Sequence, residues 1–218
     1  MKNNYSILLK KITGMAVFSA LAIVVAFVFR IPVLFLSFDA KDAIITIAAF
    51  IYGPFTAPIM SLLVAFIEMI TFSDTGPYGF IMNFASSATF SLVSSLIYKY
   101  RRTFNGSLIG LYSAVVAVVA VMLGLNTLIT PAYLGVPTAE VVKLLPGILL
   151  PFNLAKALIN SAIVMLLYKP IIMSMRRAKL IDRNANDVGF NRKSIYSIVI
   201  ASVTLVVAIV IFVILKNS

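Results

Sequence analysis

One apolar stretch of the chain carries three polar side chains at helical spacing. The stretch LPFNLAKALIN (150–160) lies inside an apolar run from Gly147 to Tyr168, yet it contains Asn153, Lys156 and Asn160. The spacing i, i+3, i+7 places all three on one face of a helix. If that helix crosses a membrane, an ionised lysine near the bilayer centre costs about 2.5–3.5 kcal/mol. Lys156 therefore needs a charged partner or a polar pocket.

Polar side chains from other segments are expected at the same depth. Glu68, Asn83 and Asn126 each lie near one end of a different apolar segment, and a preceding loop supplies Asp39, Lys41 and Asp42. We expect Lys156 to contact a ligand, with Glu68 as its counter-ion. The alternative is that Lys156 extends toward the membrane surface or pairs with Glu68 only to hold the helices together. For Asn83 and Asn126 the alternative is hydrogen bonding between helices.

The predicted ligand is a flat, apolar ring system with a neutral portion rich in hydroxyl or amide groups. Aromatic residues surround the polar cluster, and amides can both donate to and accept from hydroxyls. The aromatic residues are Phe35, Phe38, Tyr78, Phe80, Phe84, Tyr133 and Phe152. The ligand-binding residues we predict are Asn153, Lys156, Asn83, Asn126, Asn160, Glu68, Phe35, Asp39, Lys41, Tyr78, Thr130 and Tyr133.

The segments that carry these residues predict an all-α integral membrane protein. The chain is 61% hydrophobic and 11% charged, whereas soluble domains average about 45–50% apolar and 25% charged residues. Apolar runs follow one another along the chain, and many are close in length to the roughly 20 residues that span a bilayer. We expect a six-helix transmembrane bundle and a further C-terminal transmembrane helix. The expected helices are 8–29, 42–52, 55–72, 80–100, 107–128, 147–174 and 195–215, with breaks at Gly53-Pro54 and Pro77–Gly79 and an irregular segment over 130–147.

Several classes of function are disfavoured by what the sequence lacks. The chain has no cysteine and no histidine, which argues against disulfides, thiol chemistry, a zinc site or another metal centre. It has no phosphate-binding glycine motif, so ATP would be bound by another chain. No chain of carboxylates crosses the membrane and no internal repeat is evident, which disfavours an autonomous ion-coupled carrier. An intramembrane enzyme would lack a nucleophile–base pair.

The basic residues predict the orientation in the membrane. Of the 18 basic residues, 13 lie near the start of the first expected helix, after the fourth, or between the sixth and seventh, whereas Arg30, Lys41, Lys143 and Lys216 lie on the other side. If the six helices alternate in direction, these three regions share one side, so the N-terminus is expected in the cytoplasm of a bacterial-type cell. The net charge of +11 then reflects topology and lipid contact, not nucleic-acid binding. The expected units are a membrane domain over 1–174, a cytoplasmic polar linker over 175–194 and an additional helix, read as a peripheral anchor, over 195–215.

The first helix carries a pattern of small residues. Ala16 and Ala20 are four residues apart, as are Ala22 and Ala26, and such spacing lets another helix approach closely. Packing inside the bundle is the alternative use of the same pattern.

In this order along the chain, the motifs resemble the S components of energy-coupling factor (ECF) vitamin transporters, and most closely the riboflavin-specific, RibU-like members. The similarity covers about residues 8–173. Its motifs are the helix-one alanines, FLSFDAKDAIITIAAFIYGP (35–54), IEMITFSDTGPYGFIMNF (67–84), YKYRRTFNGSLIGL (98–111), LNTLITPAYLGVP (125–137) and LLPFNLAKALIN (149–160).

The resemblance implies a six-helix bundle that binds one vitamin tightly from outside and requires no cofactor. It implies partners, namely a transmembrane coupling (T) subunit and two ATPase (A) subunits, with the bundle toppling in the membrane to release the vitamin inside. By the PFNLxK motif, Asn153 and Lys156 would contact riboflavin or FMN. Asn83 and Asn126 fall on other pocket positions, and Ala16 and Ala20 match the motif that docks on the coupling subunit. A thiamine precursor or pyridoxine are alternative ligands.

Overall fold

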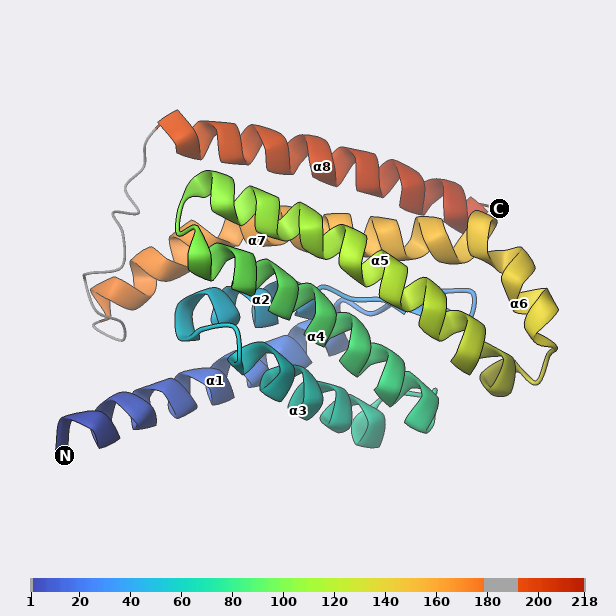
Figure 1. Cartoon of the computed structure of the whole chain (residues 1–218), viewed down its shortest axis with the longest axis horizontal. Coiled ribbons are helices and arrows are strands. Elements are labelled where there is room, and N and C mark those ends of the chain that lie inside the picture. The colour runs from blue at the N-terminus through green and yellow to red at the C-terminus, as the bar shows by residue number, and fades with distance from the viewer. Residues whose placement is uncertain (1, 179–191, 218) are drawn as a thin grey trace.

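The computed structural model describes residues 2–178 and 192–217 of the chain. Helices dominate it, and Figure 1 shows them lying side by side along the long axis of the molecule. The elements in chain order are α1 (Lys2–Val28), β1 (Ile31–Val33), β2 (Leu36–Phe38), α2 (Lys41–Tyr52), α3 (Thr56–Thr71), α4 (Gly76–Tyr100), α5 (Phe104–Leu134), α6 (Thr138–Leu144), a π-helical turn (Leu145–Leu149), α7 (Leu150–Arg177) and α8 (Arg192–Asn217).

The prediction of an all-α membrane protein is confirmed. In the described part of the chain, five helical stretches are long and apolar enough to cross a bilayer. They lie at 8–28, 76–100, 105–134, 138–177 and 198–215. The 16-residue α3 is apolar but shorter, and α2 has only 12 residues. The expected bundle of six helices that each cross the membrane completely is therefore not confirmed, because α2 and α3 are shorter than the other helices.

Two predicted breaks in helical structure were wrong. Pro77 does not interrupt the chain, because it stands in the first turn of α4, where its missing N–H has no helical partner to lose. The segment 130–147 is mostly helical instead of irregular: α5 continues through Pro131 to Leu134, with Gly135 (φ 68°) after its last residue, and only residues 135–137 separate it from α6. After α6, Pro146 and Pro151 remove two N–H donors around the π-helical turn. The helix adopts the wider π-helical form there and continues into α7 without a break.

A short antiparallel hairpin between α1 and α2 was not expected from the sequence. Each strand has three residues, and Val33 pairs with Leu36 across a two-residue turn. Leu34 in that turn has a φ of 55°, a left-handed conformation that non-glycine residues rarely adopt. The hairpin leads directly into Asp39 and the start of α2, so it fixes where those residues lie.

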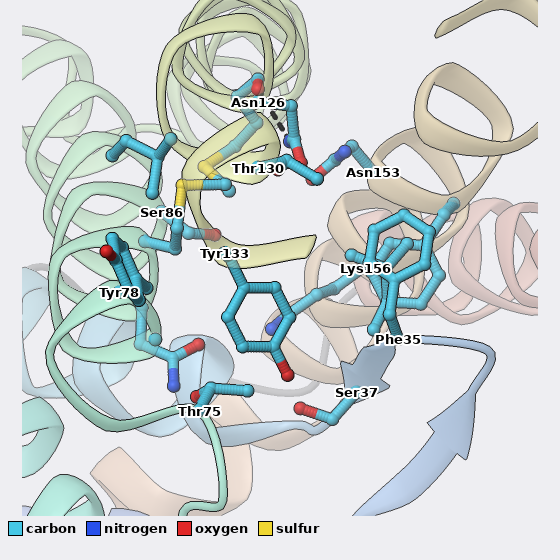
Figure 2. A pocket seen from close by; sticks show the side chains of 17 residues that line it. Phe35, Ser37, Thr75, Tyr78, Ser86, Asn126, Thr130, Tyr133, Asn153 and Lys156 are labelled. Atoms are coloured by element: carbon cyan, nitrogen blue, oxygen red, sulfur yellow. Dashed lines mark hydrogen bonds between the residues drawn. The ribbon is translucent and has the colours of Figure 1, made fainter. Parts of the chain in front are cut away.

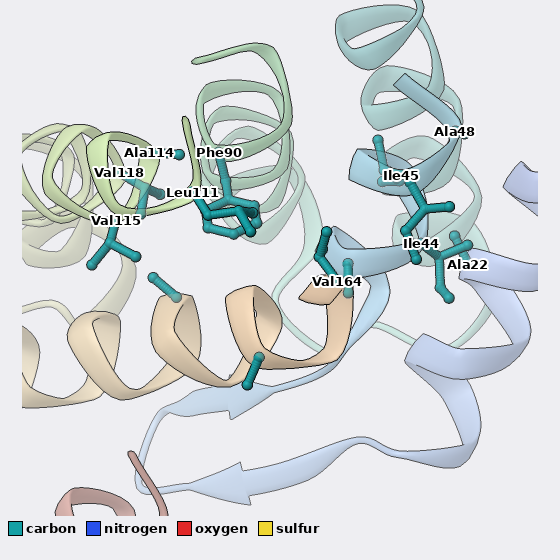
Figure 3. Packing of buried hydrophobic residues seen from close by; sticks show 14 of the residues in the cluster. Ala22, Ile44, Ile45, Ala48, Phe90, Leu111, Ala114, Val115, Val118 and Val164 are labelled. Atoms are coloured by element: carbon teal, nitrogen blue, oxygen red, sulfur yellow. The ribbon is translucent and has the colours of Figure 1, made fainter. Parts of the chain in front are cut away.

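The apolar core lies between α2, α4, α5 and α7. It is built from small and medium side chains, and Figure 3 shows Ile45, Phe90, Leu111 and Val164 among those that meet there. The face of α4 toward the core is lined with serines, of which Ser87, Ser91 and Ser94 are almost completely buried. Serine is small, so α2 can approach α4 closely, and Ser87 and Ser91 form hydrogen bonds with Asp42 and Thr46 on α2. This packing fixes how far along the bundle axis the polar residues of both helices lie.

A close approach of α4 and α5 gives a test of the core packing. A side chain at Gly110 would place its Cβ 2.7 Å from the backbone oxygen of Ser94. Overfilling a packed core costs about 1–3 kcal/mol, so Gly110→Val should lower the thermal unfolding temperature by several degrees. Gly124→Val is the matched control on the same helix, since nothing lies within 4 Å of its Cβ. Equal unfolding temperatures for the two variants in detergent would contradict the described packing.

The seventh expected transmembrane segment is α8, and it lies along α7 (Figure 1). The helix α7 runs beyond the expected end, to Arg177, and α8 begins at Arg192. Most of the linker predicted over 175–194 lies outside the described residues.

Candidate ligand-binding site

A pocket opens at the end of the bundle opposite to the start of α1. It is bounded by the start of α4, the end of α5, the start of α7 and the hairpin. Figure 2 shows Tyr78, Tyr133, Asn153 and Phe35 surrounding this common space. Its volume is about 690 Å³, including the part open to solvent.

Helical spacing explains which side chains line the pocket. On α5, Asn126, Thr130 and Tyr133 follow one another at i, i+4 and i+7, and all three face the pocket. They remain on one face because α5 continues past Pro131. On α4, Gly79, Asn83 and Ser86 follow the same rule. Tyr78 and Tyr133 approach each other from the two helices, with ring centroids 6.0 Å apart.

Two of the pocket amides, Asn126 and Asn153, are held by hydrogen bonds to nearby backbone and side-chain groups of the chain segment in which they lie. The Asn126 side-chain N–H donates to the Met122 carbonyl at 2.7 Å, and its oxygen accepts from the Thr130 hydroxyl at 2.8 Å. The Asn153 side-chain N–H donates to the carbonyl of Leu149, the last residue of the π-helical turn, at 2.7 Å. These bonds fix the orientation of each amide before any ligand arrives.

A buried network of ion pairs lies directly behind the pocket. Lys156 reaches from the pocket wall to Asp39, with an Nζ–Oδ2 distance of 2.9 Å, and Lys41 approaches the same oxygen at 3.3 Å. Lys41 also pairs with Glu68 at 2.7 Å. Asn83 donates to Glu68 at 3.4 Å, which connects the network back to the pocket. The network thus ties α7, the hairpin end, α2, α3 and α4 together.

The Asp39 carboxylate is the centre of this network. Burial raises the pKa of Asp39, but the charges of Lys156 and Lys41 lower it by more, so its pKa falls below the usual range. The carboxylate therefore stays ionised at neutral pH. A buried ion pair is costly to break from one side, because the remaining partner keeps an uncompensated charge.

The remaining buried polar groups anchor the start of α2. Asn160 accepts from the backbone N–H of Ala43 at 2.8 Å and donates to the carbonyl of Asp39 at 3.2 Å. Asp42 accepts a hydrogen bond from the Ser87 hydroxyl on α4. These bonds hold Asp39 and Lys41 in positions from which Lys156 and Lys41 can pair with Asp39, and Lys41 can also pair with Glu68.

The structure corrects the expected counter-ion of Lys156. Lys156 pairs with Asp39, whereas Glu68 pairs with Lys41. The sequence could not distinguish these pairings, since the hairpin that brings Asp39 to α7 was not predicted.

The predicted site residues fall into two groups. Those that line the pocket are Asn153, Lys156, Asn83, Asn126, Phe35, Tyr78, Thr130 and Tyr133. Those that lie behind it in the polar network are Asp39, Lys41, Glu68 and Asn160. Of the other aromatic residues, Phe152 lines the pocket, while Phe38 contacts Phe212 and Phe80 contacts Phe66.

Sequence reasoning missed several lining residues. They are Leu36, Ser37, Thr75, Gly79, Met82, Ser86, Met122 and Ile129. Ser86 and Met122 are one helical turn from the predicted asparagines and Met82 is one turn from the predicted Tyr78, so extending the i±3 and i±4 rule would have found them. Ser37 lies in the unpredicted strand β2 and Thr75 lies just before α4, where helical spacing gives no such guide.

Comparison with known proteins places this arrangement in a family. The family model described as "ECF transporter, substrate-specific component" matches residues 10–168. The chain belongs to this family. As an S component it is a substrate-binding subunit of a membrane transporter, which works with T and A subunits, and it lies in the cell membrane as a multi-pass protein.

Two relatives are similar to this S component over most of its length. It is 29% identical over 177 residues to the "Riboflavin transporter RibU" of Staphylococcus aureus (strain TCH60), covering 77% of this chain and 93% of that protein. A solved structure described as "Structure and mechanism of the S component of a bacterial ECF transporter" matches with a TM-score of 0.66 and 27% identity. That match covers 77% of this chain and 98% of the solved one.

The small residues on the first helix of the S component lie on its outer surface. Ala16 and Ala20 are exposed, while the neighbouring Phe18 and Ser19 pack inward. The two alanines are therefore not used for packing inside the described bundle. They form a smooth patch that another helix could approach.

Proposed function

We propose that this S component binds riboflavin from outside the cell and delivers it for ATP-driven uptake. The observation that carries the proposal is the composition of the pocket, in which aromatic rings and oriented amides converge. Riboflavin combines a flat aromatic ring system with a polar edge and a neutral chain of hydroxyls. Phe35, Tyr78 and Tyr133 supply apolar and aromatic surface for the rings. Asn126, Asn153 and Thr130 supply hydrogen-bonding groups.

The charge of the site supports a neutral ligand. Lys156 contributes the charged group of the pocket lining, and its ammonium is already paired with Asp39. A neutral vitamin can bind beside this pair without bringing a further charge into a low-dielectric site. The similarity to a protein named as a riboflavin transporter supports the same choice.

The orientation of the S component in the membrane supports binding from outside the cell. The start of α1, the connection between α4 and α5, and the end of α7 lie together at the end away from the pocket (Figure 1). These segments carry Lys10, Lys99, Arg101 and Arg177. By the positive-inside rule that end faces the cytoplasm, so the pocket opens outward. The N-terminus is then cytoplasmic.

The substrate is tested by asking what the protein carries through purification. Riboflavin absorbs in the visible range, so the S component purified from cells should be yellow and release a flavin on denaturation. A colourless, folded protein that instead releases a thiamine-related compound or pyridoxine would replace riboflavin by that vitamin. Uptake driven by an ion gradient in liposomes holding this chain alone would instead indicate an autonomous carrier.

Truncating the pocket amide should weaken binding. Asn153→Ala removes a group that we expect to meet the polar portion of riboflavin and leaves its partner unpaired. Such a loss costs about 1–3 kcal/mol, which raises the dissociation constant roughly 5- to 150-fold. Lys156→Ala should weaken binding similarly. Titration with riboflavin, followed by quenching of its fluorescence, measures both.

The matched control is Asn105→Ala, since Asn105 is exposed at the start of α5, far from the pocket along that helix. Its affinity should equal that of the wild type. If Asn153→Ala and Lys156→Ala both bind as tightly as this control, the ligand site lies elsewhere.

A further inference from the structure

The helix α8 presents one narrow buried face to the bundle. Ala201, Thr204, Ala208 and Leu215 are buried, at spacings that put them on one side of the helix. The two alanines are completely covered, which lets α8 lie close to α7. Thr204 adds a hydroxyl contact of 2.7 Å with Tyr112 on α5. This specific docking is more than a peripheral membrane anchor requires.

The C-terminal part of this face contacts the hairpin. The ring of Phe212 packs edge-on against Phe38 at the end of β2, with centroids 5.5 Å apart. Ala208 and Leu215 belong to the same buried cluster as Phe38. Phe152 is a further member of the cluster and also lines the pocket. Apolar contacts therefore run without interruption from α8 to the pocket wall.

The hairpin depends on such outside contacts for its position. An isolated two-stranded hairpin is marginally stable, and here each strand has only three residues. Its turn includes the exposed Leu34 with an unfavourable positive φ. The hairpin alone therefore gives weak support to its pocket-lining residues, which are Phe35, Leu36 and Ser37.

We propose that α8 is a positioning element of the ligand site, and that Phe212 acts through Phe38 to hold the hairpin against the pocket. The ligand is riboflavin only if the function proposed above is correct. Phe212 does not line the pocket, so it acts on the ligand indirectly. The family match ends at residue 168, before α8 begins, so the α8 side of this contact lies outside the matched region.

Dissociation kinetics of riboflavin from the full chain in lipid nanodiscs test the proposal. Phe212→Ala should speed dissociation about tenfold with little change in association, because the hairpin opens more often. Phe38→Ala should do the same, and the double variant should be no faster than either single one, since both remove one contact. The control is Val213→Ala, an exposed neighbour on α8 that should dissociate at the wild-type rate.

A second readout needs no ligand. The backbone amides of residues 31 and 33–38 should exchange hydrogen faster in Phe212→Ala than in the wild type or in Val213→Ala. If the wild type does not bind riboflavin, the proposed function fails, while amide exchange still decides the role of α8. Unchanged exchange in Phe212→Ala, or additive effects of the two phenylalanine variants on dissociation, would overturn the inference. If Phe212→Ala does not fold, Phe212→Leu, which removes the ring contact, replaces it.

Discussion

Replacing the Asp39 carboxylate by an amide should lower riboflavin affinity on the order of a hundredfold. In Asp39→Asn, the ammonium of Lys156 loses its partner at 2.9 Å, while Lys41 keeps only Glu68. Breaking a buried ion pair from one side costs about 3–5 kcal/mol, because a charge is left uncompensated. Lys156 would then turn away from its place in the pocket wall. Fluorescence quenching gives the affinity, and thermal unfolding of the ligand-free protein gives the stability.

Two further variants distinguish the effect of the unpaired charge in Asp39→Asn from other effects of the substitution. Asp74→Asn is the matched control, because Asp74 is exposed and its pair with Arg30 spans 3.6 Å at the surface, where such pairs contribute about 0–1 kcal/mol. In Asp39→Asn combined with Lys156→Met, the stranded charge is gone, so thermal stability should recover while affinity stays low. Wild-type affinity and stability in Asp39→Asn would show that the network does not support the site.

Enlarging the small residues on α1 should abolish uptake without affecting binding. Ala16→Phe and Ala20→Phe together place two rings on an exposed surface where we expect the coupling subunit to pack. Neither alanine lines the pocket, so the protein should keep its affinity for riboflavin. Cells that contain the complete transporter and take up labelled riboflavin measure the first effect, and purified protein measures the second.

A bulky residue elsewhere on the surface serves as the control for this experiment. Val210→Phe lies on the exposed side of α8, away from α1 (Figure 1), and should allow normal uptake. Loss of riboflavin binding in the α1 variant would mean that the alanines pack the bundle instead. Undiminished uptake in that variant would place the coupling surface on another helix.

Much of the site followed from helical spacing in the sequence. The shared face of Asn153 and Lys156, and the convergence of Asn83 and Asn126 with them, needed only the helical period and alternating helix directions. Asn160 shares their face but lies deeper, where α2 begins, so it holds the Ala43 backbone instead of lining the pocket. The period predicts a face, whereas depth depends on how neighbouring segments pack.

The features that escaped prediction depend on contacts between distant segments. Three-residue strands in an apolar chain leave no periodic pattern, and Leu34 adopts a turn conformation that its residue type disfavours. The hairpin was therefore missed, and with it the pairing of Asp39 with Lys156. The docking face of α8 was hidden because that helix is apolar all around. Its small residues, Ala201 and Ala208, mark the face only once α7 is seen beside them.

The most direct test of the proposed function is equilibrium binding of riboflavin to the purified, ligand-free S component. Riboflavin fluorescence should be quenched in a saturable titration with one site and a dissociation constant well below about a micromolar, which means a binding free energy more negative than about −8 kcal/mol. Thiamine and pyridoxine should not compete. A folded protein that leaves riboflavin fluorescence unchanged up to micromolar concentrations, or that releases it on addition of either of those vitamins, would contradict the assignment.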